Sequence, residues 1–413
     1  MKILVIGGGG REAALVHKIS KSPRVTRIFC APGNAGIASH ATRVPIADDQ
    51  IDSLLKFAKE NQIDLTIVGP EKPLSLGIVN RFREAGLRIF GPTKEAAQLE
   101  SSKVFSKNFM RKYKIPTANA EVATLDAAYE KITTMKMPIV LKVDGLAAGK
   151  GVVIANNPNE AKAGLDYFRK IGKGTEDILI EQYLTGVEAT FFVVADGEVV
   201  IPLATAKDHK RLMDADHGPN TGGMGAISPA PFFTPDLHEQ VMTRIVRPTL
   251  KGLSDEGISY QGVLYVGLML TNDGPYVLEF NARLGDPEAQ VVLPRLLTDW
   301  IDLVDAVISH RLDQLTLTWE EQVAVCVVLA SKGYPDAPQN GDEIFGLDQI
   351  KDSAVTIFHS GTKQEGNKIV TSGGRVLGIT ALGSDLSEAR EKAYQAVGSI
   401  QFSGMQYRND IGK

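Results

Sequence analysis

The sequence predicts an α/β protein of several domains that begins with a parallel sheet. The chain has 413 residues, too many for one hydrophobic core, and roughly two to four domains are expected at this length. Over its N-terminal part, β-branched runs alternate with helical patterns, and such alternation is typical of a parallel sheet. After Trp319 the pattern changes to short strands and one closing helix, which indicates a small C-terminal α+β module.

The N-terminal sheet is expected to open with a strand, a glycine turn and a helix. Lys2–Ile6 is a β-branched run, Gly7–Gly10 follow it, and Arg11–Val16 has a helical pattern. This succession opens a Rossmann-like fold, in which the amides at the helix start can hold a phosphate. The second expected strand, Arg27–Cys30, runs into Ala31–Asn34 without the acid that would hold a cofactor ribose. The sequence therefore predicts the fold and argues against NAD binding.

Further elements complete this predicted domain. They are a helix over 51–60, a strand over 64–68, a helix over 74–85, a strand over 87–90, and helices over 93–99 and 102–113. Ile115-Pro116-Thr117 then breaks the helical pattern and marks a boundary. Loops that follow parallel strands share the edge at which such sheets bind ligands. The residues expected at that edge are Gly8, Gly9, Gly10, Arg11, Glu12, Asn34 and Glu71.

A glycine-rich loop, Gly145–Gly151, lies between two expected strands. Those strands span 138–144 and 152–155. The loop resembles a P-loop but has one residue too few between its glycines, and Gly151 stands where that motif has Ser or Thr. Small residues let backbone amides approach anionic oxygens, and Lys142 and Lys150 add positive charge. The pattern favours a hairpin that folds over phosphates as a lid, and the alternative is an exposed hairpin with incidental lysines.

Two acids flank a short turn that follows a helix expected over 159–170 and a strand over 177–181. An adenosine would fit this turn, with its adenine edge read by the backbone and its ribose held by Glu188. From spacing alone the signal is weak, because two surface glutamates beside a turn are common. The residues concerned are Glu181, Gln182, Tyr183, Leu184 and Glu188.

Residues 206–225 fit no period and read as polar chain without regular structure. Some ~20 such residues inside a domain are usually functional or disordered, so a substrate-binding loop is predicted. Its polar side chains and glycines are Lys207, Asp208, His209, Lys210, Asn220, Thr221, Gly222, Gly223 and Gly225. His209 has no partner at the spacing of a catalytic triad or a metal site, so a hydrogen-bonding role is expected for it.

The stretch Val277–Glu288 is the most informative in the chain. Strand alternation places Glu279 and Asn281 on one face, with Leu278 and Phe280 on the other. A carboxylate and an amide oxygen are hard donors of the kind Mg²⁺ accepts, and Arg283 adds a guanidinium fork for a carboxylate or phosphate. The alternative is an amphipathic strand with a polar outer face.

Beyond Arg283, Asp286-Pro287-Glu288 looks like an N-cap, a first-turn proline and a first-turn acid that open a helix. Helical pattern extends over 287–310 with an interruption at Pro294. The expected elements of the C-terminal module are strands over 324–331, 355–362, 368–371 and 375–381 and a helix over 386–400. No catalytic constellation is visible in that module, although Lys332–Pro335 could line a neighbouring site.

Composition sets the class of protein. The net charge of −4 gives no sign of attraction to nucleic acid or membranes. Cys30 and Cys326 lie in apolar runs and are expected to be buried free thiols in a reducing compartment. No apolar run approaches the ~18 residues of a membrane span, and the N-terminal run is too short for a signal peptide. A cytoplasmic protein is expected.

These segments together resemble the glycinamide ribonucleotide synthetases, a family of ATP-grasp ligases in purine biosynthesis, over essentially the whole chain. The matching segments are Gly7–Leu15, Ala31–Gly36, Val68–Pro73, Ile89–Leu99, Leu141–Val153, Lys207–Arg211, Gly218–Pro231, Gly262–Gly267, Leu278–Glu288 and Gly373–Thr380. Two positions depart from the family pattern. Ala13 stands in place of a histidine, and Leu284 in place of a phenylalanine.

The resemblance implies an organisation and a reaction. It implies a Rossmann-like domain over 1–102, an ATP-grasp domain over 103–316 with a mobile lid near 120–187, and a C-terminal α+β domain over 320–413. ATP would phosphorylate glycine, and 5-phosphoribosylamine would displace phosphate to give glycinamide ribonucleotide, ADP and phosphate. Its partners would be small molecules, with neither nucleic acid nor membrane, and the family favours a monomer.

The resemblance also implies site residues. Glu279 and Asn281 would hold Mg²⁺ or Mn²⁺. ATP would be bound by Lys103, Lys142, Gly145, Gly149, Lys150, Gly151, Glu181, Gln182, Tyr183, Leu184 and Glu188. Arg283, Lys207 and Asp208 would be catalytic, and together with His209, Lys210 and 220–225 they would position glycine and the transferring phosphoryl group. Gly8–Glu12, Asn34 and Glu71 would line the place of phosphoribosylamine.

Three alternatives stay open at this stage. Another ATP-grasp carboxylate–amine ligase would share the motifs and differ in its acid or amine. A nicotinamide-dependent oxidoreductase would rest on the Gly7–Ala13 turn, against which the missing acid counts. A non-catalytic nucleotide-binding regulator is the third.

Overall fold

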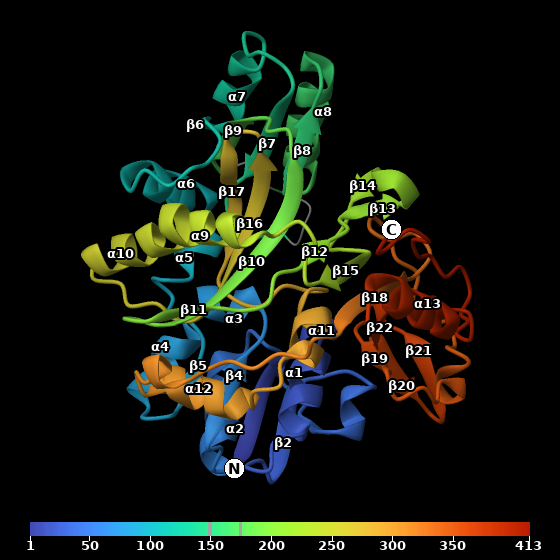
Figure 1. Cartoon of the computed structure of the whole chain (residues 1–413). Helices are drawn as coiled ribbons and strands as arrows, with labels where there is room; N and C mark the ends of the chain where they lie inside the picture. The colour runs from blue at the N-terminus through green and yellow to red at the C-terminus, as the bar shows by residue number, and fades with distance from the viewer. Residues whose placement is uncertain (148–150, 173–175) are drawn as a thin grey trace.

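The N-terminal part of the chain forms a parallel sheet, seen at the bottom of Figure 1. The computed structural model describes residues 1–147, 151–172 and 176–413. The strands lie in the order β3 (Thr42–Arg43), β2 (Arg27–Pro32), β1 (Lys2–Gly7), β4 (Leu65–Val68) and β5 (Ile89–Phe90). Each neighbouring pair is parallel, which confirms the prediction. The helices are α1 (Gly10–Ser20), η1 (Ile37–Ser39), α2 (Ile51–Glu60), α3 (Glu71–Ser75), α4 (Ile78–Glu84), α5 (Gln98–Ser101) and α6 (Lys103–Lys112).

Two predicted helices of this region are wrong in extent. The helix expected over 74–85 is divided between α3 and α4 by Gly77, whose φ of +88° lies in the left-handed region. A glycine adopts that conformation without the steric cost of a side chain, so the chain can turn there. The helix expected over 93–99 is mostly turn, and helical structure begins only at α5.

The central sheet is antiparallel and has the order β11 (Val200–Pro202), β10 (Val187–Asp196), β16 (Gln261–Thr271) and β17 (Gly274–Asn281). The helical run α9 (Pro235–Val241), η3 (Met242–Val246) and α10 (Arg247–Asp255) packs against it. A β-bulge interrupts the register of β17: Gly267 pairs with Glu279, but Leu268 pairs with Val277. Because Leu278 is the extra residue, Val277 and Phe280 are the buried pair, and the prediction that Leu278 shares the face of Phe280 is wrong.

A separate four-stranded unit, the predicted lid, projects above the central sheet (Figure 1). Its antiparallel strands have the order β6 (Ala120–Ala123), β9 (Ile178–Gln182), β7 (Ile139–Val143) and β8 (Val152–Ala155). The helices α7 (Leu125–Lys131) and α8 (Pro158–Lys170) cover the sheet. Leu141, Phe168 and Ile180 belong to a hydrophobic cluster made of lid residues. The lid therefore has its own core, and β7 and β8 form the predicted hairpin around the glycine loop.

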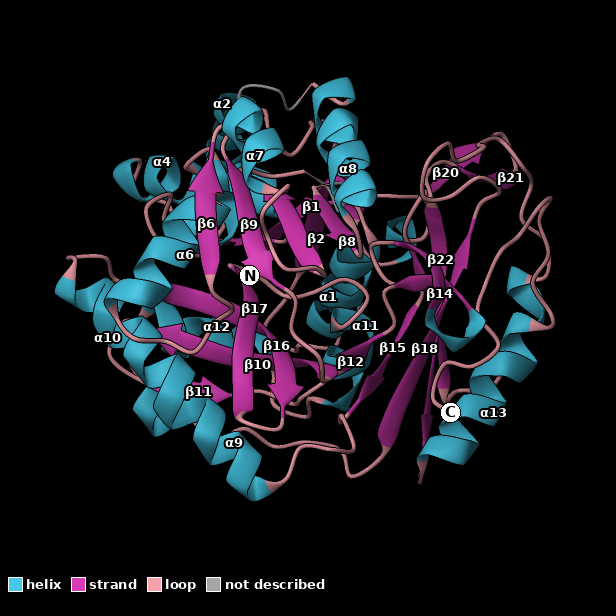
Figure 2. Cartoon of the chain, turned by 90° about the horizontal axis from the view of Figure 1, so that it is seen from above, coloured by secondary structure: helices cyan, strands magenta, loops and turns pink. Residues whose placement is uncertain are grey.

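The C-terminal sheet draws strands from two parts of the chain. Its order is β12 (Lys207–Asp208), β15 (Gly225–Ser228), β18 (Val323–Ala330), β22 (Arg375–Gly383) and β19 (Val355–His359). Figure 2 shows α13 (Leu386–Val397) lying over it, with the small hairpin β20 (Thr362–Glu365) and β21 (Lys368–Thr371) at one end. The linking elements are α11 (Ala289–Val292), η4 (Leu293–Arg295), α12 (Trp300–Ile308), η5 (Leu312–Gln314) and η6 (Leu347–Gln349).

Regular structure occupies much of 206–225, contrary to the prediction. Besides β12, this segment contains the hairpin β13 (Arg211–Met213) and β14 (His217–Asn220), with the turn η2 (Asp214–Asp216) between them. These strands are too short to give a recognisable alternation, which is why no period was visible. The segment thus joins the central part of the chain to the C-terminal sheet through the pairing of β15 with β18.

The predicted helix start at Asp286 is also wrong. Helix α11 begins at Ala289, and Glu288 is its N-cap residue. The Asp286 carboxylate instead accepts from the backbone amide of Arg11 at 3.2 Å and from Gln290 Nε2 at 2.8 Å.

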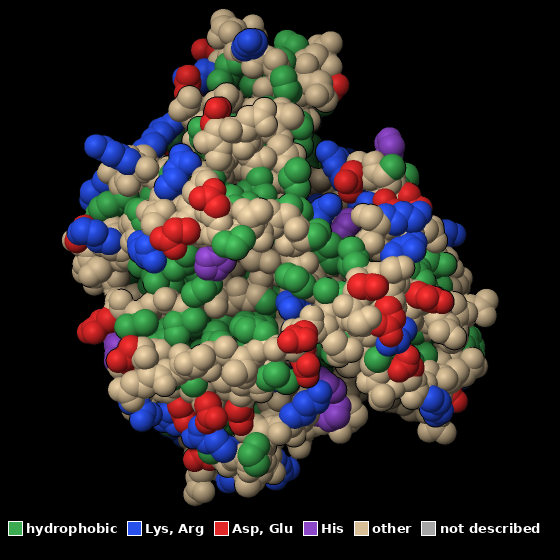
Figure 3. All heavy atoms as spheres, in the orientation of Figure 1, with side chains coloured by type: hydrophobic (Ala, Val, Ile, Leu, Met, Phe, Trp, Pro, Cys, Tyr) green, Lys and Arg blue, Asp and Glu red, His purple; other side chains and the backbone are tan. Residues whose placement is uncertain are grey.

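Two expectations from composition can be compared with the structure. Cys30 and Cys326 are buried free thiols, as predicted. Within the described ranges, no helix is both long enough and apolar enough to cross a bilayer. On the face seen in Figure 3, acidic and basic side chains are interspersed, in keeping with the net charge of −4.

Candidate active site

A carboxylate and an amide oxygen lie two residues apart at the end of β17. Glu279 and Asn281 are both half-buried, and Lys210 Nζ lies 3.8 Å from Glu279 Oε1. Burial opposes ionisation of the carboxylate, but the ammonium groups of Lys210, Lys142 and Lys103 outweigh it and hold the pKa of Glu279 below its ordinary value. The strand edge therefore presents an anion among cations.

The donor chemistry of this pair fits a hard divalent cation such as Mg²⁺. The Asn281 Oδ1 atom accepts from Arg283 Nη2 over a long contact of 3.3 Å. No group of three or more His, Cys, Asp and Glu side chains in the described part of the chain could hold a metal ion by itself. Mg²⁺ usually keeps waters and shares phosphate oxygens, so two protein ligands beside a nucleotide are a sufficient set.

Two half-buried glutamates, Glu71 and Glu100, hold the Arg283 side chain. Its Nη2 atom is 2.7 Å from Glu100 Oε1, and its Nε atom is 3.3 Å from Glu71 Oε2. Burial opposes the charged form of Arg283, and these carboxylates outweigh it and raise its pKa above the ordinary value. Since the amide of Ala282 also donates to Glu100 Oε2 at 2.7 Å, Glu100 fixes both the backbone and the guanidinium at this point.

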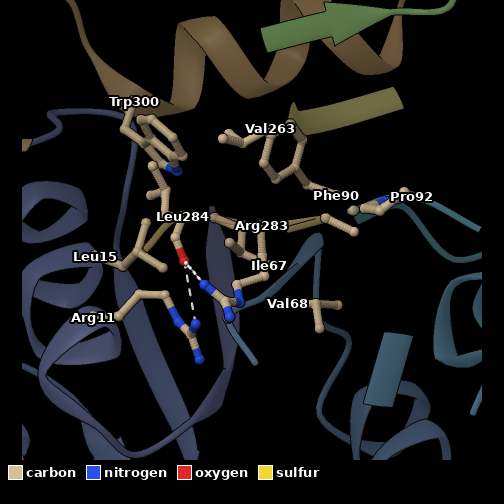
Figure 4. Close-up of a pocket in the computed structure, with 13 residues that line it drawn as sticks. Arg11, Leu15, Ile67, Val68, Phe90, Pro92, Val263, Arg283, Leu284 and Trp300 are labelled. Atoms are coloured by element: carbon tan, nitrogen blue, oxygen red, sulfur yellow. Dashed lines mark hydrogen bonds between the residues drawn. The ribbon is translucent and has the colours of Figure 1, made fainter. Parts of the chain in front are cut away.

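A second guanidinium lies beside that of Arg283 (Figure 4). Arg11 Nη1 and Arg283 Nη1 both donate to the carbonyl oxygen of Leu284, at 3.2 and 3.1 Å. Arg11 is buried and pairs through Nε with Glu12 at 2.6 Å. The glycine turn of the N-terminal sheet is thus connected to the end of β17, although the two are far apart in sequence.

The lid meets the central sheet through a buried cluster of charges. Lys142 Nζ and Lys107 Nζ lie 2.7 and 2.8 Å from the two carboxylate oxygens of Glu181. Burial opposes ionisation of Glu181, but Lys142 and Lys107 outweigh it and keep its pKa below the ordinary value. Lys142 also donates to the carbonyl oxygen of Leu278 at 2.9 Å, which ties β7 of the lid to β17. Lys103 donates to the carbonyl oxygen of Gly145 at the entrance of the glycine loop, at 2.8 Å.

Asp208 lies against the glycine-rich turn that follows β14. A Cβ atom on Gly223 would come within 2.6 Å of Asp208 Oδ1 and 2.4 Å of Pro287 Cδ, and φ at Gly223 is +113°. Only glycine fits there. Asp208 Oδ1 has no hydrogen-bond partner among the described residues. Burial and the neighbouring Glu288 raise the pKa of Asp208 well above its ordinary value, against the opposing charges of Lys210 and Arg375.

His209 is buried, and its Nδ1 atom has no hydrogen-bond partner in the part of the chain that the structure describes. Burial, with the positive charges of Lys207 and Arg408, lowers the pKa of His209 to about 4. Its backbone amide donates to the carbonyl oxygen of Gly225 at 2.9 Å. The residue is therefore neutral near pH 7, and its main-chain contact holds the segment in place.

The C-terminal sheet fixes the glycine-rich turn 220–225. The amide of Gly222 donates to the Tyr334 hydroxyl at 2.8 Å, and Arg375 Nη1 donates to the Gly222 carbonyl oxygen at 2.5 Å. Arg375 Nη1 also donates to the carbonyl oxygen of Asp286 at 2.6 Å. One arginine of β22 therefore joins the substrate segment to the loop that follows β17.

A polar cavity of about 360 Å³ lies where the N-terminal and C-terminal sheets meet. Its lining residues are Gly8, Gly9, Gly33, Asn34, Asp286, Ser360, Gly361, Thr362, Ser372 and Arg375. Asn34 is buried, and its Nδ2 atom donates to the carbonyl oxygens of Gly8 and His359 at 2.9 and 2.7 Å. The side chain of Asn34 thus holds the glycine turn and the C-terminal sheet together at the cavity.

The structure places several of the predicted site residues close to one another. Lys210 Nζ lies 3.7 Å from Glu188 Oε2 and 3.8 Å from Glu279 Oε1. The carboxylate expected to hold the ribose, Glu188, and the carboxylate expected to hold the metal, Glu279, therefore share one lysine. Gln182, Tyr183 and Leu184 lie at the surface-exposed end of β9. Lys207 is half-buried in β12. Predicted phosphate ligands Gly149 and Lys150 lie outside the described residues.

Sequence reasoning missed several residues of the site. Lys107 lies within the helix expected over 102–113 and Glu100 lies just before that helix, and neither residue belongs to a recognisable motif. Ser360, Thr362 and Arg375 come from the module in which no constellation was visible. The one available signal was the match at Gly373–Thr380, which contains Arg375.

The arrangement is that of an ATP-grasp enzyme: a hairpin lid with a glycine loop faces an antiparallel sheet whose edge carries a carboxylate and an amide. Models of the phosphoribosylglycinamide synthetase N domain, ATP-grasp (A) domain and C domain match residues 1–100, 101–289 and 324–413. A phosphoribosylamine–glycine ligase of Caldanaerobacter subterraneus is 49% identical over 100% of this chain and 99% of its own length. The chain belongs to the phosphoribosylglycinamide synthetase family, whose members are C–N ligases.

Solved structures agree with this assignment. The crystal structure of the phosphoribosylamine–glycine ligase from Thermotoga maritima is 36% identical, covers 100% of both chains and superposes with a TM-score of 0.86. The biotin carboxylase domain of Hydrogenobacter thermophilus 2-oxoglutarate carboxylase, solved with MgADP and bicarbonate, has a TM-score of 0.73 over 98% of this chain and 91% of that chain. At 16% identity the second likeness shows the fold alone. A nicotinamide-dependent oxidoreductase is excluded by the family.

Proposed function

We propose that the chain joins glycine to 5-phosphoribosylamine at the expense of ATP, with phosphoryl transfer at the end of β17 and the amine supplied from the polar cavity. The observation that carries the proposal is the contact between the lid and the carboxylate edge. Lys142 reaches from β7 to the carbonyl oxygen of Leu278, next to Glu279. A triphosphate held by the glycine hairpin would therefore lie beside the candidate metal ligands.

ATP would be held by the lid and by the lysines that face it. Lys103 and Lys142 carry positive charge at the mouth of the hairpin, where Lys103 already contacts the Gly145 carbonyl oxygen. The backbone of Gln182–Leu184 would face adenine, and the exposed carboxylate of Glu188 would accept the ribose hydroxyls. Glu279 and Asn281 would hold Mg²⁺ or Mn²⁺, which when bound would neutralise charge on the transferring phosphoryl group.

Glycine would be activated before the amine attacks. A carboxylate is a poor electrophile, so one of its oxygens would attack the γ-phosphorus of ATP, the bond to the β-phosphate oxygen would break, and ADP would leave. Arg283 Nη1 has a second N–H besides the one given to Leu284, and it would bind an oxygen of glycine or of the phosphoryl group. Because Glu100 and Glu71 fix the guanidinium, that N–H has a defined direction.

The amine nitrogen of phosphoribosylamine would then attack the carbonyl carbon of glycyl phosphate. The bond from carbon to the phosphate oxygen would break, phosphate would leave, and the nitrogen would give up a proton. Asp208 has an unpaired buried oxygen beside the glycine-rich turn, which suits a proton acceptor. The polar cavity would receive the sugar phosphate, with the Gly8 and Gly9 turn, the Ser360 hydroxyl and Arg375 as its donors.

The reaction assay tests this proposal directly. With ATP, Mg²⁺, glycine and 5-phosphoribosylamine, ADP is expected to form in step with glycinamide ribonucleotide, which mass spectrometry identifies. Leaving out glycine should reduce ADP release to the background rate. ADP release that needs a different acid or amine would instead favour another ATP-grasp carboxylate–amine ligase, and ADP release that needs neither would reject the ligase reaction.

Asp208→Asn is expected to lower kcat by about 10²- to 10⁴-fold, the usual contribution of a general base. Because the pKa of Asp208 is raised, its basic form is populated only at a higher pH than is usual for an aspartate. The wild-type kcat/KM for phosphoribosylamine should therefore rise with pH through this ionisation, and the variant should lack that limb. The pH profiles of both proteins decide the matter: an acid limb of unchanged midpoint in the variant would assign the proton to another group.

A further inference from the structure

A short hairpin interrupts the segment that carries the candidate catalytic residues. The hairpin β13–β14 lies between Lys207–Lys210 and the glycine-rich turn 220–225, so its position sets the spacing of those two parts. The residues of its outer end, Met213–Pro219, are exposed, and Met213 is 55% exposed. The hairpin therefore has no apolar anchor at its tip, and polar contacts must hold it.

The C-terminal tail supplies those contacts. The buried guanidinium of Arg408 donates through Nη1 to Asp216 Oδ1 at 2.6 Å and to the Arg211 carbonyl oxygen at 3.2 Å. The backbone amide of Asn409 donates to Asp214 Oδ1 at 2.7 Å, and its side-chain Nδ2 donates to Asp214 Oδ2 at 3.1 Å. Asp214 and Asp216, the first and last residues of the turn at the hairpin tip, thus accept hydrogen bonds from the tail.

Asp410 completes this clamp. It receives both Nε and Nη2 of Arg408, at 2.7 and 2.8 Å, and also the backbone amide of Ala215 at 2.8 Å. Such a bidentate pair fixes the plane of the guanidinium and also balances its positive charge. Because Asp410 holds Arg408 and the hairpin at once, the contacts form one network in which each member supports the others.

The tail is itself held firmly on the C-terminal sheet and helix. The hydroxyl of Tyr394, on α13, donates to the Arg408 carbonyl oxygen at 2.7 Å and accepts from the Ile411 amide at 3.1 Å. Ile411 is fully buried, and its side chain lies against Gly225, where an added Cβ atom would be 2.9 Å from Ile411 Cδ1. The tail therefore touches both the tip of the hairpin and the end of the glycine-rich turn.

We propose that Arg408–Ile411 is a positioning element of the active site: it sets the place of the β13–β14 hairpin and, through it, of the residues that bind glycine and the transferring phosphoryl group. This inference rests on the proposed function for the identity of the substrate. The alternative is that the tail only completes the C-terminal module and that the hairpin contact has no effect on catalysis.

A charge exchange between Asn409 and Asp214 tests the proposal. Asn409→Asp places two carboxylates against each other, so the hairpin is expected to separate from the tail. The KM for glycine should rise about tenfold, the size of a coupling within one hydrogen-bond network, while the KM for ATP should stay within twofold. Trypsin cleavage after Arg211 should accelerate in parallel. The double variant Asp214→Asn with Asn409→Asp restores one amide and one carboxylate and should return both readouts to the wild-type values.

Lys413→Ala is the matched control, since this side chain is exposed at the end of the same tail and should change neither readout. Faster cleavage with an unchanged KM for glycine would overturn the proposal and leave the tail a simple tether. Equal increases in the KM values for glycine and ATP without rescue by the double variant would also overturn it, because they indicate general destabilisation. Failure of the wild-type protein to use glycine would reject the proposed function instead, and the trypsin comparison would still report whether the tail places the hairpin.

Discussion

Glu279→Gln is expected to lower kcat for ADP formation by about 10²- to 10³-fold, which is the scale of losing one preorganised charged group at a phosphoryl-transfer site. The substitution keeps the shape of the side chain and removes its negative charge. A neutral amide at this place is a weaker ligand for a divalent cation, and Lys210 would lose the Glu279 carboxylate as a neighbour. Because Glu279 is only half-buried on β17 and glutamine has the same shape, the substitution should leave the sheet unaffected and thermal unfolding unchanged.

The control for this variant is Asp273→Asn, in the exposed turn that joins β16 to β17. It makes the same chemical change in the same hairpin, away from the lid, and should retain the wild-type rate. If Glu279→Gln turned over at the wild-type rate with saturating ATP and Mg²⁺, the assignment of this carboxylate to the metal would be wrong.

Glu181→Leu is expected to destabilise the junction of lid and central sheet by about 3–5 kcal/mol, the usual cost of removing one partner from a buried ion pair. The variant would leave the ammonium groups of Lys107 and Lys142 buried near each other without a counterion. Native-state hydrogen exchange of the β9 amides is the measurement, because it reports this region separately from the rest of a multidomain chain. Exchange there should accelerate, while exchange in β1 should not change.

Lowering the pH should also accelerate hydrogen exchange of the β9 amides in the wild-type protein. The folded pKa of Glu181 is lowered by its two lysines, so its contribution to stability is present above the unfolded pKa and is lost as the pH falls through the folded value.

Glu121→Gln is the control for Glu181→Leu, because Glu121 lies on β6 of the same sheet and its partner Lys131 is exposed. It should leave β9 exchange unchanged, and an equal effect of the two variants would show that the buried cluster is not what fastens the lid.

Local patterns were sufficient for much of the fold. The alternation of β-branched runs and helices predicted that the strands of the N-terminal sheet are parallel, and the glycine loop between two apolar runs predicted the β7–β8 hairpin. Glu279 and Asn281 could be placed on one face because strand periodicity applies to them. The bulge at Leu278 could not be predicted, since it arises from the register against β16 rather than from the residues of β17.

The parts of the site that sequence reasoning missed depend on contacts between distant segments. Arg375 reaches Gly222 and Asp286 across 153 and 89 residues, and nothing near it in the sequence signals those partners. Lys107 looks like a solvated helical lysine until β9 brings Glu181 against it. The polar cavity likewise exists only because the N-terminal and C-terminal sheets meet there. Of its lining residues, Gly8, Gly9 and Asn34 could be predicted as site residues, whereas Ser360 and Thr362 could not.

The most direct measurement is a crystal structure of the protein with Mg²⁺ and a non-hydrolysable ATP analogue. The triphosphate should lie between the Gly145–Gly151 hairpin and the end of β17, with the metal on Glu279 and Asn281 and with Lys142 turned toward phosphate oxygens. A nucleotide bound instead at the Gly7–Gly10 turn of the N-terminal sheet, with no metal near Glu279, would contradict the account.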